Sequence, residues 1–193
     1  MSIPTSISPM GLSRSKNPVK PGLLNEAERR SSRLIIGVDP GLASTGWGVL
    51  EYSRGRLRYI AHGCIETPAE EARGQRLVSI YKSFRKILKF YKPGEAAIEN
   101  LYFGRNISSA MTVAEARGVL LMTLTGEGIP VTELTPNAIK KAVVGVTSAD
   151  KNQIQEMVRF LLGLKEIPRP DHAADALGAA ICAAHLGSLP QRI

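Results

Sequence analysis

The stretch Leu34-Ile35-Ile36-Gly37-Val38-Asp39-Pro40-Gly41 decides the fold class of this 193-residue chain. It begins as a short apolar run rich in β-branched side chains, which is typical of a buried central strand. The run ends in a carboxylate and two turn residues, so Asp39 is expected at the C-terminal tip of that strand. Open α/β sheets place ligands and catalytic groups in the crevice outside such tips. The alternative is that Asp39 only starts the turn at Pro40-Gly41.

Two further strand patterns follow, over residues 46–52 and 57–65, joined by the tight connection Ser53-Arg54-Gly55. They predict an antiparallel meander with the first strand. Farther along the chain, the run at 95–100 again consists of apolar residues that end in an acid. Glu99 is therefore a second candidate for the same crevice.

The remaining segments alternate between helix and strand signals, without an internal repeat. The order β-β-β-α-β-α-β-α-α-α predicts an α/β fold with a five-stranded mixed sheet flanked by helices. The expected helices lie at about 77–91 and 108–126, from 135 onward, between 148 and 162, and at 171–185, and the last two strands lie at 95–100 and 130–134.

Composition points to one folded domain, expected over residues 33–188, because 44% hydrophobic and 22% charged residues are ordinary for a globular chain of this length. No apolar run approaches the ~20 residues that cross a bilayer. A secretory signal is not expected either, since the N-terminus has no continuous apolar segment. Cys64 and Cys182 lack metal-ligand spacing, which favours two buried free thiols in a reducing compartment.

The first 32 residues are rich in Ser and Pro and carry five basic and two acidic residues. They cannot bury enough surface to offset the entropy of ordering, so a disordered basic tail is expected. Residues 189–193 are expected to form a short C-terminal tail. Up to about Asn25 the composition also fits an organelle transit peptide, although a translation start upstream of the domain would look the same.

The formal net charge of +8 suggests a polyanionic partner, with nucleic acid as the leading candidate. Residues 1–32 account for +3 of this charge and the globular part for +5, and one face of the helix at about 77–91 with its flanks is basic. That basic face is either plain solvation or part of a nucleic-acid footprint, and both interpretations stay open. Its members are Arg73, Arg76, Lys82, Arg85, Lys86, Lys89 and Lys92.

Asp39, Glu99 and the last helix together offer a set of hard metal ligands. On that helix His172 and Asp175 stand three residues apart, which places both on one face. Clustered carboxylates raise each other's pKa unless a cation neutralises them, and such ligands suit Mg²⁺ or Mn²⁺. Two such ions about 3.5–4 Å apart can activate a water and stabilise the leaving oxygen of a phosphodiester.

The choice of ligands on the last helix has alternatives. A His near the start of a helix is often a capping or surface residue rather than a ligand. Asp171 is a competing carboxylate, about 100° away from His172 around the helix. Asp171 is more simply explained as an N-terminal charge that the helix dipole favours.

Six short motifs occur in order along the chain: Asp39-Pro40-Gly41, Thr45-Gly46-Trp47-Gly48, Ala97-Ile98-Glu99-Asn100, Ala116-Arg117-Gly118, Val143-Val144-Gly145 and His172-Ala173-Ala174-Asp175-Ala176-Leu177. Together they resemble the RuvC family of Holliday junction resolvases, from about Leu34 to about His185. The resemblance implies an RNase H-like fold and a homodimer. It also implies Mg²⁺- or Mn²⁺-dependent symmetric nicking of four-way DNA junctions, together with a branch-migration motor of RuvA and RuvB type. A bacterial cytoplasm is the expected location, or an organelle if residues 1–25 are a transit peptide.

The resemblance also assigns site residues by position. The catalytic acids and metal ligands fall on Asp39, Glu99 and Asp175, and the fourth ligand falls on His172. The chemistry of the clustered acids itself predicts two ions per site, with Asp39 as the bridging ligand. Tyr102, with Phe103 beside it, matches the aromatic that stacks on junction bases, although core packing is the alternative. The remaining DNA contacts are expected at Arg105, Lys140 and Lys151.

A dimer interface is expected on the helix at 108–126, since two matched cuts call for a twofold dimer. Ala110, Ala114 and Gly118 would permit close approach of a second helix, while Val113, Arg117 and Leu121 could fill and pair across the axis. The alternative is that this helix packs on its own sheet.

Three other functions compete with junction cleavage. An RNase H-fold nuclease acting on RNA would keep the same fold. An ATP-binding protein of the actin-like or sugar-kinase type would share the Asp-x-Gly turn, but 193 residues are too few for its two lobes. A catalytically dead junction-binding module would not need the complete set of four ligands.

Overall fold

The computed structural model describes residues 32–100 and 107–187. Its elements follow the predicted order. The predictions for the two tails and for Tyr102, Phe103 and Arg105 lie outside the described residues. The strands are β1 (Arg33–Asp39), β2 (Ser44–Ser53), β3 (Arg56–Glu66), β4 (Glu95–Glu99) and β5 (Val131–Leu134), and the helices are α2 (Arg73–Tyr91), α3 (Ile107–Gly126), α4 (Pro136–Val144), α5 (Lys151–Leu161) and α6 (Asp171–Leu186).

The five strands form one mixed sheet in the order β3-β2-β1-β4-β5. Strand β1 is antiparallel to β2 and parallel to β4, and β2 is antiparallel to β3. The predicted meander and mixed sheet are therefore confirmed. The register pairs Val38 with Ile98, so Asp39 and Glu99 come next on two neighbouring parallel strands.

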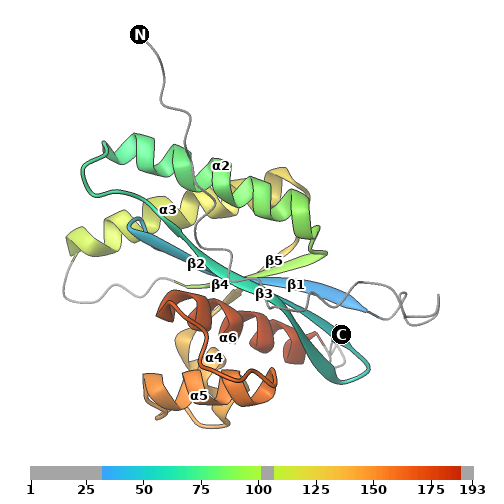
Figure 1. The fold of residues 1–193 in the computed structure, drawn as a ribbon. Helices are drawn as coiled ribbons and strands as arrows, with labels where there is room; N and C mark the ends of the chain where they lie inside the picture. Colours follow the sequence, from blue (N-terminus) through green and yellow to red (C-terminus); the bar gives the residue numbers. More distant parts are fainter. Residues whose placement is uncertain (1–31, 101–106, 188–193) are drawn as a thin grey trace, which may run out of the picture.

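Helices cover both faces of the sheet (Figure 1). Helices α2 and α3 lie on one face, and α6 lies on the other with α4 and α5 packed outside it. The core under α2 and α3 is built from large side chains such as Ile36, Phe84 and Leu120, which are fully buried. The core under α6 contains many alanines, together with Leu177 and Ile181.

Helix α6 approaches the sheet closely because glycines face it. A Cβ added at Gly37 would lie 1.9 Å from the carbonyl oxygen of Ala176, and one added at Gly46 would lie 2.0 Å from that of His172. Only a residue without a Cβ leaves room for the helix backbone at these two positions. The start of α6 is thereby held over the tip of β1.

Local signals account for the helix ends. Thr135 caps α4 by accepting a hydrogen bond from the backbone N–H of Ala138, as its position before Pro136 predicts. Helix α5 begins at Lys151, where Asp150 and Gln153 form a capping box. The helix therefore starts slightly later than the sequence pattern after the Gly145–Ser148 segment predicts.

Two further predictions concern the membrane and the cysteines. No helix in the described part of the chain is long and apolar enough to cross a membrane. Both cysteines are free, as expected, but only Cys182 is buried. Cys64 is half-buried, and its sulfur lies 2.9 Å from the Ser44 hydroxyl.

Candidate active site

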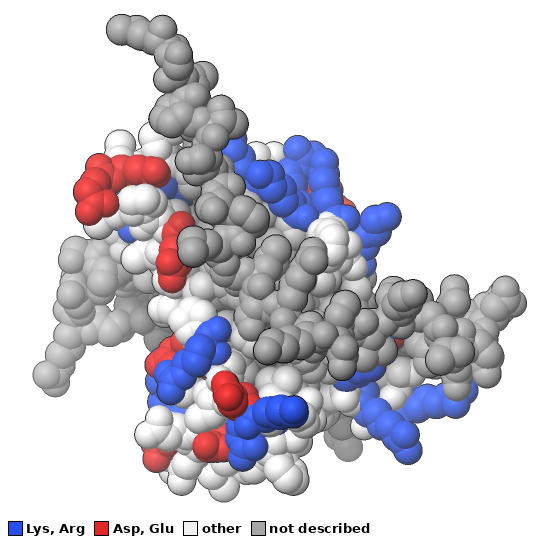
Figure 2. Space-filling model, in the orientation of Figure 1, with Lys and Arg blue, Asp and Glu red and all other residues white. Residues whose placement is uncertain are grey.

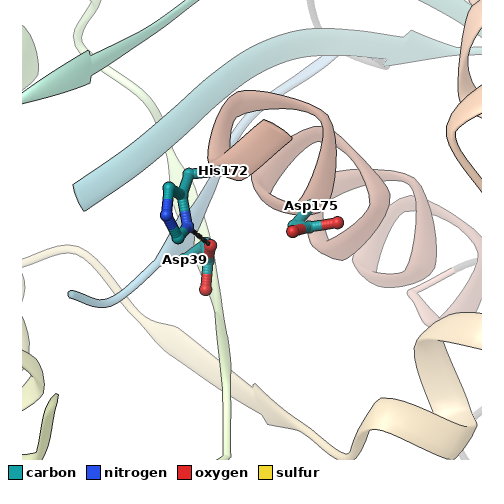
Figure 3. Close-up of side chains that lie close together, drawn as sticks. All are labelled: Asp39, His172 and Asp175. Atoms are coloured by element: carbon teal, nitrogen blue, oxygen red, sulfur yellow. Dashed lines mark hydrogen bonds and ion pairs between the residues drawn. The ribbon is translucent and has the colours of Figure 1, made fainter. Parts of the chain in front are cut away.

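Asp39, His172 and Asp175 meet at one edge of the sheet (Figure 3). Each offers a ligand atom, and the three atoms lie within 4.8 Å of one another. The closest pair is Asp39 Oδ2 and His172 Nδ1, 2.6 Å apart. Residues that are 133 positions apart in the sequence are thus in direct contact.

The fold explains why these three side chains converge. Side chains alternate along a strand, and Gly37 faces α6, so Asp39, two residues on, faces α6 as well. Gly46 brings the backbone of His172 onto the sheet. Asp175 follows one turn later on the same face of the helix, as its spacing from His172 predicted.

Glu99 extends the cluster from β4. Ala97 belongs to the core under α6, so Glu99, two residues later, points to the same face as Asp39. Burial, together with the charges of Asp39 and Asp175, raises the pKa of Glu99 to about 7. Glu99 is therefore close enough to interact electrostatically with both carboxylates, although it lies outside the group of Asp39, His172 and Asp175.

The other members of the cluster are perturbed by the same causes. Burial and the charge of Asp39 raise the pKa of Asp175. The hydrogen bond to Asp39 raises the pKa of His172 and outweighs the opposing effect of burial. The edge of the sheet thus carries closely spaced acids that favour a positive charge among them.

Lys151 supplies part of that positive charge. Its Nζ lies 3.4 Å from an oxygen of Asp175 and 3.3 Å from one of Asp171. Burial lowers the pKa of Lys151, but these two carboxylates raise it more. Asp171 also accepts a hydrogen bond from Arg169 at 2.5 Å, so the competing acid faces two cations, whereas His172 faces Asp39.

The contact between Lys151 and Asp175 could not have been read from spacing, because α5 and α6 meet only in the tertiary fold. Lys140, the other lysine assigned by resemblance, is half-buried in α4. Within residues 32–100 and 107–187, no salt bridge or hydrogen bond links Lys140 to the acidic cluster.

Arg117 was assigned to the dimer interface, but its guanidinium is directed at the end of β4. It donates hydrogen bonds to the backbone oxygen of Glu99 at 3.4 Å and to Asn100 Oδ1 at 3.0 Å, and it pairs with Glu133. These bonds hold the segment that carries Glu99. Sequence reasoning missed this role, because the separation of 17 or 18 residues leaves no periodic signal.

The other residues expected at the dimer interface differ in exposure. Ala110 is buried, Ala114 and Leu121 are half-buried, and Gly118 is exposed with open space around it. Of these small residues, Ala110 is therefore covered, whereas Gly118 is open to solvent.

Comparison with known proteins gives clear relatives. Residues 35–183 match the family described as "Crossover junction endodeoxyribonuclease RuvC". A protein of that name from Treponema denticola is 48% identical over 170 residues, which cover 87% of this chain and 96% of the relative. One from Chloroflexus aurantiacus is 50% identical over 157 residues, which cover 81% and 96%.

Solved structures lead to the same family as the sequence comparison. Thermus thermophilus RuvC in complex with a Holliday junction substrate superposes with a TM-score of 0.75 at 32% identity, covering 81% of this chain and 97% of that one. The yeast mitochondrial Holliday junction resolvase Ydc2, with a TM-score of 0.59 at 10% identity and coverage of 80% and 79%, shares the fold alone. The predicted RNase H-like fold and the predicted enzyme class, an endonuclease of DNA recombination and repair, are confirmed. This chain belongs to the RuvC family of crossover junction endodeoxyribonucleases.

Proposed function

We propose that this chain resolves four-way DNA junctions by paired, symmetric nicks, with one cut from each subunit of a homodimer. The observation that carries the proposal is the meeting of Asp39, His172 and Asp175 at one edge of the sheet, next to Glu99. The related Thermus protein was solved with such a junction.

Divalent metal dependence is a property of the family, and we propose that the ions bind to Asp39, Glu99, His172 and Asp175, two in each site. The donor set fits Mg²⁺ or Mn²⁺, since it consists of carboxylate oxygens and one imidazole. Burial and, after it, the neighbouring carboxylates raise the pKa of Glu99 and of Asp175, and a bound cation would offset both effects. Bound ions would supply Lewis-acid activation of water and stabilisation of the leaving oxygen.

The protein groups around the cluster have their own tasks. The hydrogen bond between Asp39 and His172 fixes the orientation of the imidazole. The ammonium of Lys151, 3.4 Å from Asp175, is placed to hold a phosphate oxygen of the DNA. Arg117 keeps the tip of β4 in position through the carbonyl of Glu99.

The proposed dimer uses the outer face of α3. Gly118 is exposed with open space around it, while Met111 and Met122 are 55% and 60% exposed. Apolar side chains beside a glycine form a surface that a second copy of α3 could cover. Replacing Gly118 with Leu should give a folded monomer that makes unpaired nicks, whereas a dimeric Gly118→Leu protein in sedimentation would place the interface elsewhere.

The deciding experiment incubates the chain with a labelled four-way junction in Mg²⁺ or Mn²⁺. Matched duplex DNA and an RNA–DNA hybrid serve as controls. Paired nicks in the junction alone are expected. Preferential cleavage of the hybrid would instead favour a nuclease that acts on RNA. A motor of RuvA and RuvB type and a bacterial cytoplasmic location remain predictions.

A further inference from the structure

The positive charge of the folded part is concentrated on one helix. Helix α2 carries six basic residues and no acidic one, whereas the rest of residues 33–193 carries 14 basic and 15 acidic residues. Away from α2 the sequence from residue 33 onward is therefore nearly neutral. Figure 2 shows basic side chains gathered over the C-terminal half of this helix.

Neighbouring acids neutralise only part of this charge. Arg73 and Arg85 pair with Glu115 and Glu127 of α3. Lys82 and Lys86 stand four residues apart on one exposed face and form no salt bridge with any residue that the structure describes. Exposed lysines without an acidic partner among the described residues are available to a polyanion.

Helix α2 starts near the end of β1 that carries Asp39 and leads away from it. Near its start, the Arg76 side chain donates to the Thr67 hydroxyl at 2.9 Å, and that hydroxyl donates to the carbonyl of Leu42 at 2.6 Å, three residues beyond Asp39. Beyond its end, the N–H of Gly94 donates to the carbonyl of Leu34. The helix thus runs antiparallel to β1 for about 28 Å.

We infer that the face of α2 around Lys82 and Lys86 is a second DNA-binding surface, which contacts the phosphate backbone of a duplex arm leaving the catalytic edge. This inference rests on the proposed function, because its ligand is an arm of the same junction. Helix α2 packs on the sheet face opposite α6, so this surface is separate from the metal-binding cluster. It contributes affinity without reading base sequence.

The test measures junction binding without metal at several salt concentrations. The variant K82Q/K86Q should make the negative slope of log affinity against log salt less steep by about 2, roughly one per lysine. At about 0.1 M salt its affinity should fall at least tenfold. K82R/K86R should retain the wild-type slope, since it keeps both charges.

The matched control is R56Q/K165Q, which removes two exposed positive charges elsewhere on the domain. It should bind nearly as wild type. An unchanged slope for K82Q/K86Q, or an equal loss of affinity in the control, overturns the inference. The basic face of α2 would then bind an acidic protein partner or serve only for solvation. Junction binding and cleavage by the wild-type chain test the proposed function separately. A melting temperature near that of wild type confirms that each variant is folded.

Discussion

The two faces of the sheet are packed with side chains of different size. Under α6, glycines and alanines bring backbone against backbone, and a Cβ at Gly37 would lie 1.9 Å from Ala176. Under α2 and α3, large side chains such as Phe84 and Ile80 separate helix from strand. The first face fixes the distance from the helix to the strand, and the second buries apolar volume.

This difference bears on function. The packing under α6 positions His172 and Asp175 against Asp39, so the distance from helix to sheet also sets the distances between the site residues. On the other face the helices present charge to solvent, and Lys82 and Lys86 are exposed. We therefore expect changes on the α6 side to affect chemistry, and loss of charge at Lys82 and Lys86 to affect DNA affinity.

The largest expected effect is that of Asp39→Asn. Removing one charge from the centre of the cluster should abolish cleavage, because the metal site loses a ligand, while junction binding remains. Cleavage assays in Mg²⁺ and binding assays in chelator give the two readouts. Measurable nicking by Asp39→Asn would contradict its role as a bridging ligand.

Gly37→Ala should be the next largest. The added methyl group meets the backbone of α6, which has to shift, so we expect a loss of at least about 2 kcal/mol in the free energy of unfolding. Cleavage should fall more than junction binding, because the shift moves His172 and Asp175. Denaturant titration and single-turnover cleavage measure the two effects.

Gly74→Ala is the matched control on α2, where an added Cβ meets nothing within 4 Å. It should leave stability unchanged or raise it by about 0.5–1 kcal/mol. Equal destabilisation by both substitutions would mean that the two faces do not differ in the way described.

A smaller effect is expected for His172→Ala. Loss of the imidazole should weaken metal affinity about tenfold or more, or shift the preference between Mg²⁺ and Mn²⁺. Asp171→Ala should change metal affinity less, because Asp171 contacts Lys151 and Arg169. Calorimetric titration of both variants decides between them. The reverse ranking would make Asp171 the fourth ligand.

The smallest effect concerns stability without metal. Burial and the charges of Asp39 and Asp175 raise the pKa of Glu99 from 4.5 to about 7. The folded state therefore holds this proton more tightly than the unfolded state does, and stability is lost as the pH rises from about 4.5 through about 7. Glu99→Gln should raise the melting temperature in chelator at pH 8 and leave it unchanged at pH 4. No increase at pH 8 would show that burial and the neighbouring acids do not destabilise the ionised form of Glu99.

The sequence by itself determined the order of the elements and the acids at two strand tips. Strand and helix periods, Thr135 before Pro136 and the three-residue spacing of His172 and Asp175 are local features. Local conformational preference and side-chain periodicity act over a few residues, so a pattern in adjacent residues is enough to predict them. The resemblance then supported Asp39, Glu99, His172 and Asp175 as the proposed metal ligands.

Only the tertiary structure decided which of these groups meet. The contact between Asp39 and His172 spans 133 residues and exists because glycines let α6 touch the sheet. The same packing pairs Asp171 with Lys151, raises the pKa of Glu99 and turns Arg117 toward β4. Distances, burial and electrostatic coupling between remote segments depend on how closely the layers pack, and no short stretch of sequence specifies that.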